Sequence, residues 1–193
     1  MKNVYIIAGA NGSGKTIFAK KFLPRYVKCN NFINADLIAQ GISPFSPSTV
    51  SIKAGKIVLD QIKDYANKNM DFAFETTLSG KTYTNLLKDL KKRQYKIHFF
   101  YLWIPDFKLA LARIKDRVAE GGHDIPVIDV KRRFSRSINN FFSLYIILSD
   151  SWMLFDNSNP VPKLIAKYEN GNTIISDNYL FNKIEVKNNE KTS

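Results

Sequence analysis

The sequence predicts an α/β fold, a three-layer sandwich in which a mostly parallel sheet of five strands lies between layers of helices. Short apolar runs alternate with longer amphipathic segments, which is typical of parallel strands joined by crossover helices. A glycine-rich turn directly follows the first apolar run. Hydrophobic residues make up 45% of the 193 residues, enough for a sizeable core. We expect a single domain spanning residues 1–193.

Each element is assigned from its apolar pattern and the residues that punctuate it. The expected strands are 2–8, 32–35, 71–75, 96–104 and 152–155, and the expected helices are 14–22, 48–68, 83–92, 107–119 and 128–148. Pro24 should end the first helix, because proline lacks the N–H that a helix needs. The last two helices should form a lid over about 106–148. Residues 163–177 should form a C-terminal β-hairpin that turns at Asn170 and Gly171.

The composition excludes several classes of protein. The longest apolar run, 141–148, is far shorter than the roughly 20 residues that a membrane helix needs. The single cysteine, Cys29, excludes an internal disulfide framework. The first apolar run leads into glycines rather than into a cleavage site, which argues against a secretory signal. We therefore expect a cytoplasmic protein with no membrane partner.

The charge is strongly positive and unevenly distributed. The net charge is +12, and residues 81–140 carry 14 Lys and Arg residues against 6 Asp and Glu residues. Such a surplus favours anionic partners, which include nucleotides, phosphorylated metabolites, nucleic acid and acidic proteins. A basic face that only maintains solubility would give the same composition. Charge alone therefore leaves nucleic acid open as a partner.

The strongest motif lies between the first strand and the first helix and fits G-x-x-x-x-G-K-[ST]. Its residues are Gly9, Ala10, Asn11, Gly12, Ser13, Gly14, Lys15 and Thr16. Glycines let backbone N–H groups curl around a phosphate, which then lies at the positive end of the helix. Lys15 should reach the β- and γ-phosphates, and the Thr16 hydroxyl should bind Mg²⁺. The motif predicts a P-loop NTPase that binds ATP or GTP with Mg²⁺.

Two acidic residues follow strands at the edge of the sheet where ligands bind in such folds. Asp36 comes after the second strand and is the candidate general base for an acceptor hydroxyl. An N-cap for a helical turn at Leu37 is its alternative role. Glu75 and Thr76 end the third strand, where we expect them to contact substrate. Glu75 could also hold the metal through water, or simply pair with a lysine.

The predicted lid carries arginines at helical spacing around a glycine-bearing loop. The pairs Arg113 with Arg117 and Arg132 with Arg136 are each four residues apart, so each pair shares a helix face, and Arg133 lies beside Arg132. Arginine forks match phosphate oxygens, so these helices could stabilise the transferring charge. Ordinary solvated faces are the alternative. His123 in the loop is a candidate substrate contact, although a single loop histidine is more often structural.

These residues together resemble the zeta-toxin-like P-loop family, in the branch described as a predicted ATPase. The matching segments are 7–16, 34–39, 72–79, 117–118, 121–126, 132–134 and 156–158. Zeta toxins proper phosphorylate the sugar of UDP-N-acetylglucosamine with ATP or GTP and Mg²⁺. The resemblance implies a nucleoside-monophosphate-kinase-like fold, phosphate and metal binding by Lys15 and Thr16, and Asp36 as general base. It places Glu75 at substrate or metal, and Arg117 with Arg133 at a phosphate.

Two segments depart from the toxin pattern. Residues 37–40 read Leu-Ile-Ala-Gln, where toxins usually carry Phe or Leu followed by a basic residue. The third strand ends in Glu-Thr-Thr rather than Glu-Gly-Thr. The sequence thus predicts a kinase that transfers the γ-phosphate to a small-molecule hydroxyl, with a sugar nucleotide as candidate acceptor and an antitoxin protein as candidate partner. A nucleic-acid-directed enzyme and a nucleotide-binding switch without an acceptor are the alternatives.

Overall fold

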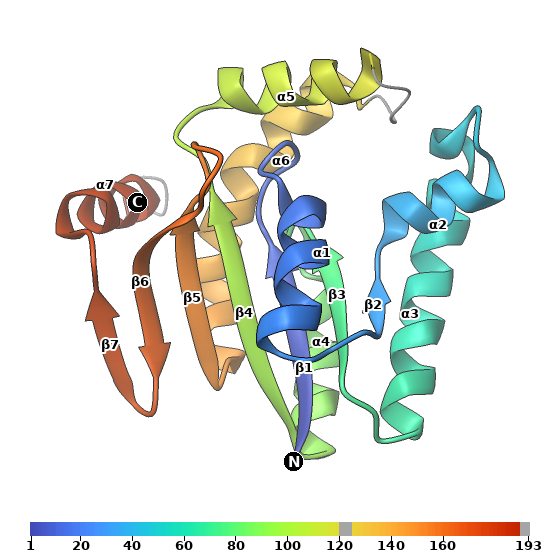
Figure 1. Cartoon of the computed structure of the whole chain (residues 1–193), viewed down its shortest axis with the longest axis horizontal. Helices are drawn as coiled ribbons and strands as arrows, with labels where there is room; N and C mark the ends of the chain where they lie inside the picture. Colours follow the sequence, from blue (N-terminus) through green and yellow to red (C-terminus); the bar gives the residue numbers. More distant parts are fainter. Residues whose placement is uncertain (120–124, 190–193) are drawn as a thin grey trace.

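The computed structural model describes residues 1–119 and 125–189, and the strands in these residues form one sheet (Figure 1). The order across the sheet is β2-β3-β1-β4-β5-β6-β7. The strands are β1 (Lys2–Ala8), β2 (Phe32–Ile33), β3 (Phe72–Thr76), β4 (Tyr95–Trp103), β5 (Ser151–Asp156), β6 (Lys163–Glu169) and β7 (Asn172–Ile175). The α/β class and the alternation of strands and helices are confirmed.

The first five strands form the parallel sheet that the sequence predicts, and the hairpin extends it. β1 to β5 pair in parallel, whereas β6 pairs antiparallel with β5 and β7 antiparallel with β6. The predicted count of five strands is therefore too low for the sheet as a whole. The hairpin joins the sheet because Ile165 and Ala166 bury their side chains in the core. Its turn lies at the predicted Asn170 and Gly171, whose φ angles of 53° and 83° are those of a two-residue hairpin turn.

The helices are α1 (Lys15–Tyr26), α2 (Ala35–Ile42), α3 (Ser51–Asn67), α4 (Thr82–Lys92), α5 (Phe107–Ala119), α6 (Val127–Asn140) and α7 (Asn178–Asn189). Pro24 does not stop α1, which continues to Tyr26. α7 was not predicted from the sequence; it is anchored on the core by Phe181 and Ile184. The single helix expected over 128–148 ends earlier, because Phe141–Tyr145 adopts a π-helical turn and Ile146–Leu148 a 3₁₀ turn.

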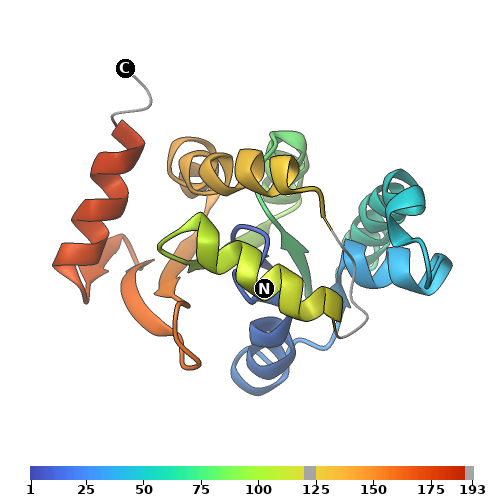
Figure 2. The same ribbon diagram turned by 90° about the horizontal axis from the view of Figure 1, so that it is seen from above.

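Helices cover both faces of the sheet, and α5 crosses its carboxyl end (Figures 1 and 2). α1 packs on one face through Ala19 and Leu23. Residues of α3, α4, the π-helical turn and α7 join the larger core on the opposite face. This is the predicted three-layer arrangement. It brings the carboxyl ends of the parallel strands together under α5, where ligands bind in such sheets.

The predicted lid is divided between two hydrophobic clusters. α5 and the first part of α6 form a small cluster of their own around Ile114 and Val130. Phe141 and Tyr145, which we expected in the lid, are fully buried in the main core. The ring of Phe141 lies 4.7 Å from that of Tyr101. Only the α5–α6 part therefore stands outside the main core.

Candidate active site

The glycine-rich segment between β1 and α1 is held in place by close backbone packing. Gly14 caps α1 at a φ of 84°, and a Cβ there would lie 2.6 Å from Nδ2 of Asn157. Gly12 has a φ of 76°, and a Cβ there would lie 3.0 Å from Cα of Ala110 in α5. Positive φ and absent space both require glycine at these two positions. The segment thus has the tight turn and helix start that suit a phosphate.

Lys15 lies at the bottom of the site and is almost fully buried. Its side chain is 7% exposed, and Nζ donates to the carbonyl oxygen of Ala10 at 2.9 Å. Nζ also lies 3.7 Å from Oε1 of Glu75, so the ion pair weighed as an alternative for Glu75 is present. Burial lowers the pKa of Lys15, while the charges of Glu75 and Asp36 act in the opposite direction. A bound phosphate would likewise favour the charged amine.

Thr16, Glu75 and Asn34 form a hydrogen-bonded group beside Lys15. The Thr16 hydroxyl donates to Oε2 of Glu75 at 2.7 Å. Nδ2 of Asn34 donates to the same oxygen at 2.7 Å and lies 3.3 Å from the Thr16 hydroxyl. These three side chains come from the start of α1, the end of β3 and the residue between β2 and α2. A hydroxyl and a carboxylate are oxygen ligands of the kind Mg²⁺ prefers, so Thr16 and Glu75 fit a metal.

Asp36 lies in the first turn of α2, with its side chain 51% exposed. The N-cap role weighed for Asp36 is wrong, because Asn34 caps the helix by accepting from the backbone N–H groups of Asp36 and Leu37. Oδ2 of Asp36 lies 3.8 Å from Nη1 of Arg117 on α5. The Asp36 carboxylate is thus available to a ligand and faces an arginine.

A cavity of about 490 Å³ brings most of the predicted site residues together. Its charged lining consists of Lys15, Asp36, Glu75, Arg117, Arg132, Arg133 and Arg136. Arg132 also pairs with Asp129 on its own helix, with 2.6 Å between Nη2 and Oδ1. Arginines of α5 and α6 therefore share one cavity with the P-loop lysine and with Asp36.

Arg113 of the predicted lid does not join this cluster. Arg113 donates to the backbone carbonyls of Asn157 and Ser158, at 2.8 and 2.9 Å, so it anchors α5 to the loop after β5. Helix-face spacing could not separate it from Arg117. His123 lies outside the described residues. Asn157, which the sequence offered only within a family motif, donates from Nδ2 to the carbonyl of Ser13 at 2.6 Å.

Another part of the cavity wall runs from the end of β3 to the start of α4. This segment contributes the hydroxyl side chains of Thr76, Thr77, Ser79 and Thr82 to the cavity. Leu78 at its centre is 1% exposed and has a φ of 54°, a left-handed conformation that is costly for leucine. Nδ2 of Asn140 donates to the Leu78 carbonyl at 2.7 Å, and the Tyr145 hydroxyl donates to the Gly80 carbonyl at 2.6 Å. The π-helical turn therefore positions this wall.

A second cavity of about 740 Å³ opens on the other side of the P-loop and is largely apolar. Phe18 and Phe22 of α1 line it with rings stacked 4.8 Å apart, and Phe155 lies across from them. Pro160, Val161 and Pro162 close the cavity from the loop after β5. Lys15 and Thr16 line this cavity, and Lys15 also lines the polar one. An aromatic ring of a ligand could stack here while its phosphates reach the P-loop.

Residues 1–144 match the family model for the zeta toxin. The chain belongs to the zeta toxin family. A relative by sequence is an uncharacterized protein of Haemophilus influenzae, which is 34% identical over 126 residues. That match covers 65% of this chain and 88% of the relative. The family indicated by the sequence motifs is thereby confirmed.

Solved structures with the same fold include toxin–antitoxin components. A complex of AvrRxo1-ORF1 and ORF2 with ATP superposes with a TM-score of 0.78 at 15% identity, covering 95% of this chain and 63% of that chain. This zeta toxin family member thus spans less than two thirds of that neighbour. The PezAT toxin–antitoxin system of Streptococcus pneumoniae gives a TM-score of 0.65 at 12% identity, covering 98% and 87%. Both likenesses confirm the P-loop kinase-like fold.

Proposed function

We propose that the protein is a phosphotransferase that moves the γ-phosphate of ATP or GTP to a hydroxyl group of a small molecule. The observation that carries this proposal is the shared cavity in which the P-loop lysine, Asp36 and the arginines of α5 and α6 meet. Membership of the zeta toxin family supports it independently.

The nucleotide is expected to bind across the P-loop. Its base fits the apolar cavity beside Phe18, Phe22 and Phe155, and its phosphates reach the N-terminus of α1. Lys15 would contact the β- and γ-phosphates. Thr16 and Glu75 would hold Mg²⁺, which when bound neutralises charge between the β- and γ-phosphates. A likeness to an ATP-containing structure supports ATP as the first nucleotide to test.

Asp36 and the arginines would act on the acceptor side. Asp36 would accept the proton of the acceptor hydroxyl as its oxygen attacks the γ-phosphate. Arg117, 3.8 Å from Asp36, and Arg133 would stabilise the charge on the transferring group. Arg132 and Thr76 line the same cavity and are proposed acceptor contacts, with Arg132 oriented by Asp129.

UDP-N-acetylglucosamine is the first acceptor that we propose, because zeta toxins act on it. The acceptor-side cavity combines four Ser and Thr side chains with four arginines, which suits a polar compound that carries phosphate. Both complexes named among the fold neighbours contain a second protein, which supports an antitoxin as partner of this chain.

We also propose a cytoplasmic location. No helix among residues 1–119 and 125–189 combines the length and apolar character that a membrane span requires.

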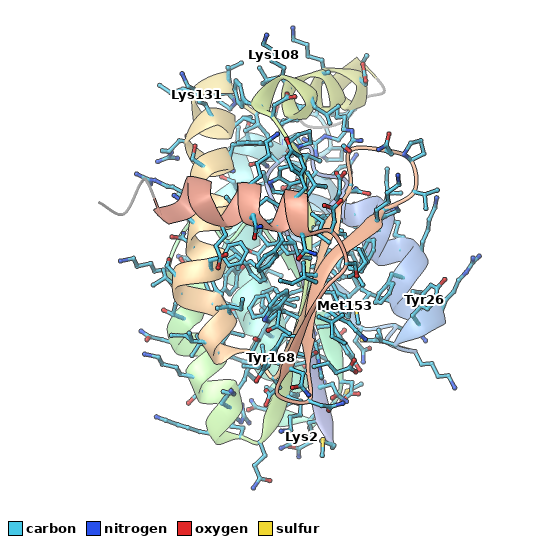
Figure 3. The ribbon with its side chains drawn as sticks, turned by 90° about the vertical axis from the view of Figure 1, so that its left-hand side faces the viewer. Lys2, Tyr26, Lys108, Lys131, Met153 and Tyr168 are labelled. Atoms are coloured by element: carbon cyan, nitrogen blue, oxygen red, sulfur yellow. The ribbon has the colours of Figure 1, made fainter. Side chains whose placement is uncertain are left out.

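The basic stretch 81–140 reaches both ends of the sheet. Lys91 and Lys96 lie near Lys2 at the amino end, whereas Lys108 and Lys131 lie at the opposite end (Figure 3). A nucleic-acid track along the whole stretch is therefore not favoured. The switch without an acceptor remains the alternative, and the loss of turnover in Asp36→Asn distinguishes it from a kinase.

Mass spectrometry of the reaction products tests the proposal. The protein is incubated with Mg²⁺-ATP and UDP-N-acetylglucosamine, with a short RNA oligonucleotide as a second acceptor, and with Lys15→Met as the inactive control. We expect UDP-N-acetylglucosamine to gain one phosphate with the wild type only. If the RNA is phosphorylated instead, the acceptor is a nucleic acid and not a small molecule. Absence of nucleotide binding and of any phosphorylated product would contradict the proposal.

A further inference from the structure

The side chain of Asn34 contacts three elements of the site at once. Asn34 directly follows β2, is 4% exposed, and caps α2, which carries Asp36. Its Oδ1 accepts from the backbone N–H of Asp36 at 2.8 Å and from that of Leu37 at 3.1 Å. Its Nδ2 meets Glu75 and Thr16. The Asn34 amide therefore lies between the Thr16–Glu75 pair and helix α2, which carries the proposed base Asp36.

The orientation of this amide follows from its partners. Backbone N–H groups only donate, so the atom that faces Asp36 and Leu37 must be the oxygen. The amide nitrogen then faces Oε2 of Glu75, at 2.7 Å, with its hydrogens. A carboxylate only accepts hydrogen bonds, so the amide nitrogen is the matching partner for Glu75.

The hydrogen bonds that Glu75 accepts show how Asn34 acts on it. Oε2 of Glu75 already accepts from Asn34 and from the Thr16 hydroxyl, both at 2.7 Å. Because the Thr16 hydroxyl directs its proton at Glu75, its remaining lone pair is free to face a cation. Glu75 therefore acts on a metal through Oε1, through water or through Thr16, and Asn34 fixes the carboxylate that aligns Thr16.

We propose that Asn34 is a positioning residue that sets the Thr16–Glu75 metal site and the proposed base Asp36 in register with each other. The inference rests on the proposed function and adds to it a residue that acts through the side chains of Thr16 and Glu75 and through helix α2. It differs from a simple helix cap, because capping uses only Oδ1, whereas the metal side uses only Nδ2.

Three variants separate these two uses. Asn34→Ser keeps a good N-cap residue but removes the amide nitrogen, and Asn34→Ala removes both. Asn172→Ser, in the exposed strand β7, is the matched control for the same chemical change far from the site. The midpoint of thermal unfolding measures how much stability the helix cap contributes. Calorimetric titration with the non-hydrolysable analogue AMP-PNP, in EDTA and in excess Mg²⁺, reports the metal site without turnover.

In Asn34→Ser we expect an unfolding midpoint close to that of the wild type and an unchanged Kd for AMP-PNP in EDTA. The gain in affinity on adding Mg²⁺ should shrink by about 10- to 100-fold, as is typical when a residue behind a metal ligand is lost. Asn34→Ala should lose the same gain and also melt earlier.

Two outcomes would overturn the proposal, and they are distinguishable. If Asn34→Ser keeps the wild-type Mg²⁺ gain while only Asn34→Ala melts earlier, Asn34 is a helix cap and nothing more. If the wild type itself binds AMP-PNP equally well with and without Mg²⁺, the proposed metal site fails, and the role of Asn34 fails with it.

Discussion

The parallel strands carry a hydrogen-bonded polar network at each end, and the two networks differ in their surroundings. At the amino end, Asp71 accepts from the backbone N–H and from Nδ2 of Asn3, at 2.7 and 2.9 Å. His98 bridges Asn3 and Ser151, with ring nitrogens 3.1 and 2.8 Å from their side-chain oxygens. These contacts tie β1, β4, β5 and the start of β3 together.

The carboxyl-end network uses similar bonds but borders a cavity. Asn34, Thr16 and Glu75 are as closely bonded as the amino-end group, yet Lys15 and Asp36 beside them face the space that the arginines line. Hydrogen bonds of the same kind thus stabilise the sheet at one end and, at the other, position the groups that we propose as the reactive ones. Changes at the amino end should therefore cost folding stability, and changes at the carboxyl end should cost turnover.

Arg117→Ala should show a large effect, on the carboxyl-end side. Removing one donor aimed at developing charge typically lowers the catalytic rate about 10²- to 10³-fold. Its ion pair with Asp36 is partly exposed, so the unfolding midpoint should change little. Single-turnover phosphoryl transfer measures the rate, with Lys115→Ala on the exposed side of α5 as the charge-matched control. Equal rates in the two variants would remove Arg117 from the site.

Asp71→Ala should show the opposite pattern at the amino end. The substitution leaves the partly buried N–H groups of Asn3 without an acceptor, which should lower the free energy of unfolding by about 1–3 kcal/mol. Urea denaturation measures this loss, and the Kd for ATP should stay at the wild-type value. A weakened ATP affinity with unchanged stability would break the division between the two ends.

The sequence was sufficient for the elements and residues that act through local patterns. The positions of the P-loop, Asp36 and Glu75 were predictable because strand ends and glycine turns are local features, whereas helix spacing indicated Arg113 and Arg117 alike. Arg113 has the same spacing, yet its partners are carbonyls in the loop after β5, forty-odd residues away. The dual use of Asn34 depends on Glu75, which the chain brings close only by pairing β2 with β3.

Other differences between expectation and structure have the same origin. The hairpin joins the sheet and α7 packs on the core because tertiary contacts bury residues such as Ile165 and Phe181. The π-helical turn at Phe141–Tyr145 places Tyr145 against the Gly80 carbonyl, a contact that helical periodicity does not predict. Long-range partners, rather than local propensity, decide these features.

Tyr145→Phe tests whether the wall of the acceptor-side cavity is held from behind. Burial raises the pKa of Tyr145 to about 12, so the hydroxyl keeps its proton and donates to the Gly80 carbonyl. Its removal should lower the free energy of unfolding by about 1 kcal/mol. The KM for the acceptor should rise while the Kd for ATP is unchanged. An unchanged KM would show that this bond serves stability alone.

The smallest expected effect is a pH dependence that arises at the amino end. Burial lowers the pKa of His98 from 6.5, against the opposing charges of Asp150 and Asp71. Between the lowered pKa and 6.5 the unfolded chain binds a proton that the native protein does not, so stability falls as the pH drops through this window. The slope for one proton is at most about 1.4 kcal/mol per pH unit. Unfolding of His98→Gln, followed over the same pH range, should show a flatter profile. An identical profile would exclude His98 as its source.

The single-turnover rate of phosphoryl transfer in Asp36→Asn, measured beside its Kd for Mg²⁺-ATP, tests the central claim most directly. Asp36 is partly exposed and does not cap its helix, so the substitution should leave the fold intact. We predict a rate lower by about 10²- to 10⁴-fold, as expected for loss of a general base, with a Kd within about twofold of the wild type. A wild-type rate of transfer in Asp36→Asn would contradict the account of the carboxyl-end cavity as a phosphotransfer site with Asp36 as its base.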